Sequence, residues 1–244
     1  MRGGNPLRMP LFWAGTLFAL LVLFMPVFAP VFAWLFPGMT PIIYPRESFL
    51  SLWLSHAGFV AISALISTAI GVTVGVFVTR EVGREFRAIV NATAVVGQTF
   101  PPAAVLALAV PAVGFGALPT LIALAIYGLL PIVENTIAGI DAVPRDVVEA
   151  GRGVGLSPRQ LLARVELPLA APYLLAGIRT SVVIGIGTAT IGSTVGALTL
   201  GAPIMSGLFS GRLPWVIQGA LVAGMFAIVT DMMFDLLIKR IGRR

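Results

Sequence analysis

Residues 149–168 read EAGRGVGLSPRQLLARVELP and form the longest polar interruption in an otherwise apolar chain. Upstream of this stretch, Pro144 suits the first turn of a helix, and Gly155 suits the position just after that helix ends. Ser157-Pro158-Arg159-Gln160 has the pattern of a capping box with proline at the first helical position. Pro168 marks the expected end of this second helix. The stretch therefore predicts two short helices joined by a hinge.

Both predicted helices carry an apolar side within polar surroundings. Val147 and Val148 supply it in the first helix, and Leu161, Leu162 and Val165 supply it in the second. Such an amphipathic pair can dock in a groove on a soluble partner. It can equally lie on the surface of a lipid bilayer. Periodicity alone leaves both interpretations open.

Composition places the chain in a membrane. Of its 244 residues, 58% are hydrophobic and 11% are charged, and the mean hydropathy is +1.00. Soluble domains carry about 25% charged residues. The basic residues behind the net charge of +6 stand in short clusters at the ends of apolar runs, so no nucleic-acid partner is expected. The absence of cysteine and the single histidine, His56, argue against thiolate catalysis and metal ligation, and we expect no catalytic residue, metal or cofactor.

Six apolar segments reach the length of about 20 residues that a helix needs to cross the hydrocarbon core. The sequence therefore predicts an all-α, polytopic membrane protein with six transmembrane helices. The first segment has a stretch resembling a signal-peptide cleavage site at Val27-Phe28-Ala29, but its apolar run exceeds the usual 7–15 residues or so, which predicts an uncleaved anchor. The predicted spans are Leu11–Phe36, Leu50–Thr79, Ile89–Val113, Leu118–Glu134, Tyr173–Leu200 and Trp215–Ile238.

Arginine and lysine are distributed unequally between the two ends of these spans. One side carries only Arg46 and Arg212. Because cytoplasmic loops carry the excess of basic residues, the sequence predicts that both termini and the Glu149–Pro168 loop are cytoplasmic, in a bacterial inner membrane. The 13 basic residues of the cytoplasmic side are Arg2, Arg8, Arg80, Arg84, Arg87, Arg145, Arg152, Arg159, Arg164, Lys239, Arg240, Arg243 and Arg244.

Two polar clusters interrupt the spans. The third span contains consecutive prolines, and a broken backbone at membrane depth is tolerated only when it is buried or lines a cavity. The fifth span contains crowded hydroxyls, which either bond back to their own helix or line a polar path. A simple kink and simple packing remain the alternatives. The candidate pathway residues are Gln98, Thr99, Phe100 and Pro101 in the third span, and Thr188, Thr190, Ser193 and Thr194 in the fifth.

Charged residues within the spans are scarce. Glu134, Asp231 and Asp235 are expected near the cytoplasmic face, where interfacial ion pairing explains them. A proton-coupled transporter would place ionisable groups deep in the bundle. Any energy for pumping must then enter from outside the membrane.

The cytoplasmic stretch resembles the EAA loop of ABC-importer permeases, whose pattern is EAA-x3-G-x9-I-x-LP. Gly151 replaces the second alanine of that pattern and Val165 replaces the isoleucine. In that family the loop inserts into a cleft of the ATP-binding subunit. The resemblance therefore implies a coupling role for Glu149, Ala150, Gly151, Gly155, Leu161, Val165, Leu167 and Pro168.

Residues 97–140 and 166–197, together with Glu47-Ser48-Phe49, resemble the osmoprotectant permeases, which import glycine betaine, carnitine and choline. The YehW-like permeases of this group share the extra N-terminal span. The resemblance implies the type I ABC importer (MetI-like) permease fold. Residues 1–49 would form the extra span and an external loop, and residues 50–244 would form the core domain with its coupling loop at 141–172.

The same resemblance implies several partners: an ABC ATP-binding subunit, a second permease subunit that is homologous or identical, a periplasmic substrate-binding protein and the surrounding lipid. The chain has no Walker A sequence, so ATP hydrolysis is expected in a separate polypeptide and the permease itself is not an enzyme. The alternatives are an importer of another small solute such as an amino acid, a secondary transporter, an intramembrane hydrolase and a pure assembly subunit.

Overall fold

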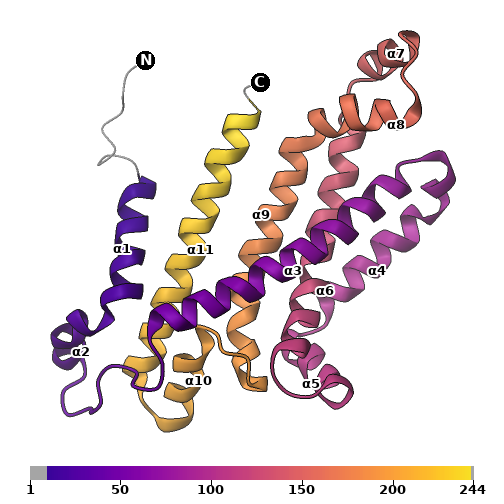
Figure 1. The fold of residues 1–244 in the computed structure, drawn as a ribbon. Helices are drawn as coiled ribbons and strands as arrows, with labels where there is room; N and C mark the ends of the chain where they lie inside the picture. The colour runs from indigo at the N-terminus through magenta and orange to yellow at the C-terminus, as the bar shows by residue number, and fades with distance from the viewer. Residues whose placement is uncertain (1–9, 243–244) are drawn as a thin grey trace, which may run out of the picture. The chain divides into compact units, whose positions relative to one another are not determined.

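The computed structural model describes residues 10–242, and between them the chain is helical and contains no strand (Figure 1). The predicted all-α class is therefore confirmed. Arg2, Arg8, Arg243 and Arg244, which entered the orientation argument, lie outside the described residues. The elements are α1 (Pro10–Phe24), η2 (Met25–Phe28), α2 (Ala29–Leu35), α3 (Phe49–Val78), η3 (Glu81–Phe86), α4 (Arg87–Thr99), α5 (Pro102–Val113), α6 (Ala117–Asp141), α7 (Arg145–Gly153), α8 (Pro158–Leu161), the π-helical turn η4 (Leu162–Glu166), α9 (Leu167–Ile191), η5 (Gly192–Val195), α10 (Gly201–Ser210) and α11 (Leu213–Ile241).

Five helical stretches between residues 10 and 242 are long and apolar enough to cross a membrane, and the bent pair formed by α4 and α5 makes a sixth when it is counted as one span. The predicted number of six spans is reached only with this pair counted as one span, whose two helices are bent by 94° relative to each other. The five uninterrupted stretches are Pro10–Leu35, Phe49–Val78, Ala117–Asp141, Pro158–Val195 and Leu213–Ile241.

The chain divides into two compact units, each assembled from separate segments. The first unit holds residues 10–63, Pro101–Leu124 and Val183–Met233. The second holds Ala64–Phe100, Ala125–Val182 and residues 234–242. Helices α3, α6, α9 and α11 therefore each contribute to both units. The expected division of the chain at residue 49 follows chain order and stays a prediction.

The N-terminal span is part of the core of the first unit. Met25 and Phe32 are buried in one cluster with Leu52 of α3 and Val222 of α11. Phe18 stacks on Phe226 with ring centroids 5.8 Å apart. Prolines 26 and 30 interrupt the helix and produce the short η2 turn between α1 and α2. The uncleaved anchor stays a prediction.

Small residues let α3 and α6 approach closely within the second unit. A Cβ atom added at Gly71 would lie 2.8 Å from Cγ2 of Ile132, and one added at Gly75 would lie 2.7 Å from Cβ of Thr136. Both distances are shorter than a carbon–carbon contact allows. The two glycines are spaced i and i+4, so they form one small stripe on which α6 packs.

Of the two alternatives for the third span, a broken backbone and a simple kink, the local backbone favours the break. Helix α4 ends at Thr99, and Phe100 and Pro101 are both extended, with ψ of 135° and 137°. Helix α5 then begins at Pro102, where the missing N–H is tolerated because first-turn N–H groups have no intrahelical partner.

Candidate functional site

Helices α7 and α8 form a hairpin that projects beyond the ends of α6 and α9 (Figure 1). The first helix of the hairpin ends as the sequence predicts. Gly155 has a φ of +82°, its N–H donates to the Arg152 carbonyl at 2.9 Å, and the Leu156 N–H donates to the Gly151 carbonyl at 3.1 Å. This pair of bonds is the Schellman motif, which needs a residue that tolerates positive φ. Pro144 stands one position earlier than expected, as the N-cap of α7.

The second helix of the hairpin opens with the predicted capping box. The Ser157 N–H donates to Oε1 of Gln160 at 2.9 Å, and the Gln160 N–H donates to Oγ of Ser157 at 3.4 Å. Pro158 occupies the first helical position. Two backbone donors at the start of α8 are thereby satisfied within four residues.

The predicted helix end at Pro168 is wrong. Helix α8 runs through the π-helical turn Leu162–Glu166 directly into α9, and Pro168 lies in the first turn of α9. The Leu167 N–H donates to the Leu162 carbonyl, five residues back. This wider turn precedes the proline, which supplies no N–H, and the helix continues through it. The hairpin is therefore continuous with a membrane span through a π turn.

The motif residues of the hairpin fall into two groups. Gly151 is buried, and a Cβ atom there would lie 2.6 Å from Cδ1 of Leu161 and 3.8 Å from Cγ2 of Val165. Leu161 is itself only 4% exposed. These three residues hold α7 against α8, and Leu167 is half-buried. The exposed members of the motif are Glu149, Ala150, Gly155 and Pro168.

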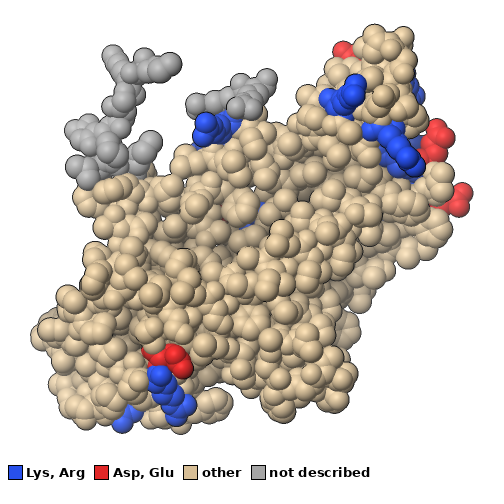
Figure 2. Space-filling view, in the orientation of Figure 1, with Lys and Arg blue, Asp and Glu red and all other residues tan. Residues whose placement is uncertain are grey.

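The exposed side of the hairpin has an apolar residue that pattern matching did not single out. Val154 is 79% exposed at the hinge, and Val147 is 38% exposed on α7. Charged side chains gather over α7 and α8 on the face shown in Figure 2, while most of the surface around α9 is uncharged. An apolar hinge within a charged surface is a suitable contact for a groove on a soluble protein.

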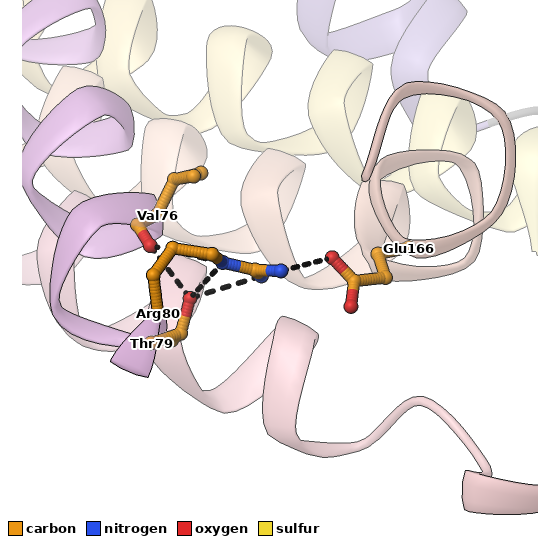
Figure 3. Close-up of polar contacts among 4 residues, drawn as sticks. All are labelled: Val76, Thr79, Arg80 and Glu166. Atoms are coloured by element: carbon orange, nitrogen blue, oxygen red, sulfur yellow. Dashed lines mark hydrogen bonds and ion pairs between the residues drawn. The ribbon is translucent and has the colours of Figure 1, made fainter. Parts of the chain in front are cut away.

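An ion pair lies at the base of the hairpin (Figure 3). Nη1 of Arg80, just after α3, lies 2.7 Å from Oε2 of Glu166. Glu166 is 7% exposed, and this oxygen accepts no hydrogen bond from any of residues 10–242, so its contact with Arg80 is an ion pair by distance alone. Nε and Nη2 of Arg80 donate to Oγ1 of Thr79 at 3.2 and 3.1 Å. Sequence patterns gave no indication of this pair, because its members are 86 residues apart in the chain.

Hydrogen bonds within the second unit hold two of the pathway candidates of the third span, Gln98 and Thr99. Gln98 donates from Nε2 to the Tyr127 carbonyl of α6 at 2.9 Å, and Thr99 donates from Oγ1 to the Val96 carbonyl at 2.8 Å. The Tyr127 hydroxyl donates to the carbonyl of Phe100. The Phe100 side chain is 49% exposed. Pro101 is also exposed and belongs to the first unit.

The hydroxyls of the fifth span bond back to their own helix. Thr190 donates to the Gly187 carbonyl at 2.6 Å, Ser193 to Thr190 at 2.9 Å and Thr194 to Ile191 at 2.7 Å. These bonds within the helix favour a packing role over a pathway role for the three hydroxyl side chains. Thr188 is half-buried. Ser193 also lines a cavity of about 540 Å³ in the first unit, beside Tyr44, Arg46 and α10. The pathway assignment stays a prediction.

His56 has a structural role. It is fully buried in α3, and the Leu200 N–H donates to its Nδ1 at 3.2 Å. The proton therefore sits on Nε2, which donates to the Ile186 carbonyl at 3.1 Å. Both ring nitrogens are used to hold the first unit together. Among residues 10–242, no cluster of three or more histidine, aspartate or glutamate side chains is arranged to hold a metal.

The charged residues within the spans behave in two ways. Asp235 is paired as predicted, 2.6 Å from Nζ of Lys239 and 3.8 Å from Nη1 of Arg179. Glu134 is exposed on α6 and makes no ion pair with any residue between 10 and 242, so the expected pairing is wrong there. Its position was inferred from helix length alone, which does not determine which way a side chain faces.

Comparison with known proteins identifies the architecture. The family model for the inner membrane component of binding-protein-dependent transport systems matches residues 71–244, which include the whole hairpin. The chain belongs to this family. It is therefore a multi-pass inner-membrane protein, and residues before 71 lie outside the matched region.

The relatives agree with this assignment. The osmoprotectant import permease protein OsmY of Salmonella typhimurium is 36% identical over 207 residues, covering 85% of this chain and 86% of that protein. The choline transport system permease protein OpuBB of Bacillus subtilis is 38% identical over 176 residues, covering 72% and 80%. The inward-facing MetNI methionine ABC transporter superimposes with a TM-score of 0.69 at 19% identity over 77% of this chain and 93% of that chain, which confirms the MetI-like fold.

Proposed function

We propose that this chain is the permease subunit of an ATP-driven importer for a small osmoprotectant, such as glycine betaine or a related quaternary amine. The observation that carries the proposal is the α7–α8 hairpin, which has the EAA spacing and keeps Glu149, Ala150 and Gly155 exposed. The named functions of OsmY and OpuBB support the solute class, as does a third relative, described as a glycine betaine/carnitine/choline permease.

The proposed partner of the hairpin is a separate ATP-binding subunit. Glu149, Ala150 and Gly155 would contact it directly, with the exposed Val154 entering an apolar groove. The buried Gly151 and Leu161, with the half-buried Val165, would keep the hairpin rigid as the ATP-binding subunit moves it. A substrate-binding protein would deliver the solute to the opposite side, and a second permease, identical or homologous, would complete the pathway in the lipid bilayer.

The short connections of the hairpin to α6 and α9 explain how a movement of the hairpin would be transmitted to the membrane-spanning helices. Only residues 142–144 separate α7 from α6, and α8 continues into α9 without a loop. A displacement of the hairpin would therefore move α6 and α9 directly. The ATP-binding subunit can drive this motion only if it binds the hairpin differently in the two transport states, because a ligand shifts an equilibrium by its difference in affinity.

Reconstitution tests the proposal. The permease, its ATP-binding subunit and its binding protein are placed in lipid vesicles, and uptake of radiolabelled glycine betaine is measured with and without ATP. We expect ATP-dependent uptake that excess unlabelled choline inhibits and excess unlabelled methionine leaves unchanged. Inhibition by methionine alone would move the assignment to an amino-acid importer.

A variant of the hairpin tests the coupling role. The double substitution Glu149→Arg, Gly155→Asp should abolish both substrate-stimulated ATPase activity and uptake, because it changes the charge of the exposed surface and places a side chain at a φ of +82°. Arg159→Gln is the matched control, since Arg159 is exposed on α8 but lies outside the motif. Normal activity in the double variant would reject the coupling role.

A further inference from the structure

We propose that the Arg80–Glu166 ion pair is the strut through which the coupling hairpin moves α3. The inference rests on the proposed function and extends it to a helix that the hairpin does not adjoin in the chain. Helices α6 and α9 are joined to the hairpin covalently, whereas α3 contacts its base through a side chain. The pair therefore makes Arg80 and Glu166 positioning residues for transport.

Arg80 is held so that it points in one direction (Figure 3). Its guanidinium donates to Oγ1 of Thr79 from two nitrogens, and Thr79 in turn donates to the Val76 carbonyl at 2.7 Å. The remaining nitrogen, Nη1, meets Glu166. Gly83 keeps the chain folded back against α3, because a Cβ atom there would lie 2.1 Å from the Phe77 carbonyl oxygen. The cation is thus fixed to the end of α3 before it meets its partner.

The π turn aims Glu166 at this cation. Leu161, Glu166 and Ala170 are all buried. In a regular α-helix two residues five apart point about 140° away from each other. The extra residue of the π turn Leu162–Glu166 brings Leu161 and Glu166 to the same side of the helix. One face of this helix therefore holds α7 through Leu161 and Gly151, and holds α3 through Glu166.

The burial of Glu166 and its lack of other polar partners suit the pair to transmitting motion from the hairpin to α3. Glu166 is 7% exposed and Oε2 has no other polar partner among residues 10–242, so losing Arg80 would leave a buried charge uncompensated. The cation is less buried than the carboxylate, since 33% of its side chain is exposed. A cavity of about 570 Å³ borders the pair and is also lined by Arg84 and Arg152. Packing around the pair is therefore incomplete, and the ion pair adds a direct link from the hairpin to the end of α3 beside the packing of α3 on α6.

The test measures solute transported per ATP hydrolysed in the reconstituted complex. Glu166→Gln keeps the shape of the side chain and removes its charge, and Arg80→Gln removes the other charge. We expect each substitution to leave ATP hydrolysis running while glycine betaine uptake per ATP falls about tenfold, within the usual range of coupling between sites. The exchange Arg80→Glu, Glu166→Arg should restore the ratio. Arg84→Gln is the control, because Arg84 lines the same cavity without contacting Glu166, and its ratio should stay at the wild-type value.

A covalent replacement of the pair separates coupling from folding. The chain has no native cysteine. The variant Arg80→Cys, Glu166→Cys should be uncoupled, and a short bifunctional thiol reagent bridging the two positions should restore uptake per ATP, while each single-cysteine variant should gain nothing. A bridged protein that stays uncoupled, or neutralised variants with the wild-type ratio, would overturn the strut. A wild-type complex without ATP-dependent uptake would overturn the proposed function, and the role of the ion pair with it. If the wild-type complex does transport, the results above would overturn the role of the ion pair alone, so the two failures are distinguishable.

Discussion

Gly151 determines how closely the two helices of the coupling hairpin approach. The position faces Leu161, whose Cδ1 atom would lie 2.6 Å from an added Cβ. The EAA pattern has alanine here, and Leu161 can accommodate one methyl group by rotating its flexible end. A larger side chain has no such remedy, because Leu156 and Val165 lie within 4 Å of the same point.

Substitution at Gly151 should therefore depend on size. We expect Gly151→Ala to retain uptake and to change the free energy of unfolding by less than about 1 kcal/mol, and Gly151→Leu to cost about 1–3 kcal/mol and to abolish coupling. Thermal unfolding in detergent and uptake in vesicles measure the two effects. Gly153→Ala is the control, since an added Cβ there meets nothing within 4 Å. Full activity in Gly151→Leu would show that close packing of the hairpin is unnecessary.

The packing of α3 on α6 is the corresponding feature at the scale of elements. Gly75→Ala places a Cβ atom 2.7 Å from Cβ of Thr136, an atom next to the backbone that cannot rotate away. The helices must separate, and we expect a loss of about 1–3 kcal/mol, read as a lower midpoint of thermal unfolding. Gly58→Ala on the same helix should be neutral, because its Cβ meets nothing within 4 Å. Equal midpoints for the two variants would contradict this packing.

The broken third span and the hydroxyl-rich fifth span make a separate prediction. If these segments line the pathway, single cysteines at Gln98, Thr99, Thr188 and Thr190 should react with water-soluble thiol reagents in at least one transport state. A cysteine at Ala170, which is fully buried in α9, should stay inert throughout. Uniform inertness of the four positions in both states would leave them with the packing role that their back-bonded hydroxyls favour.

The elements that sequence predicted correctly are those with local causes. The capping box at Ser157 and the left-handed Gly155 involve donors and acceptors within five residues, so a short pattern contains the whole interaction. Pro168 was misjudged because a proline usually ends a helix, and the π turn that lets the helix run into it leaves no mark in periodicity. The Arg80–Glu166 pair could not be predicted, since only the folded chain brings the two residues together. The resemblance to the EAA loop identified the hairpin, but not which of its residues are buried.

For the molecule as a whole, the distribution of charge predicts its orientation. Only Arg46 and Arg212 stand on the side expected to face outward, and Arg212 has a structural role there. Its guanidinium lies 4.9 Å from the ring centroid of Trp215 and donates to the Thr40 carbonyl. Tryptophan of this kind is typical of membrane–water interfaces. An arginine that is fixed to the fold in this way does not weaken the argument from the other basic residues.

Labelling from one side of the membrane tests that orientation. Val154 is 79% exposed at the hinge of the hairpin, and Phe209 is 87% exposed at the end of α10. Because the chain has no cysteine, Val154→Cys and Phe209→Cys each introduce a single reactive thiol. With a membrane-impermeant maleimide on intact spheroplasts, we expect Phe209→Cys to be labelled at once and Val154→Cys only after permeabilisation, since a hairpin that meets an ATP-consuming subunit must face the cytoplasm. Labelling of Val154→Cys in intact spheroplasts would place the hairpin outside, where no ATP-binding subunit could reach it, and would reject the coupling mechanism with the orientation.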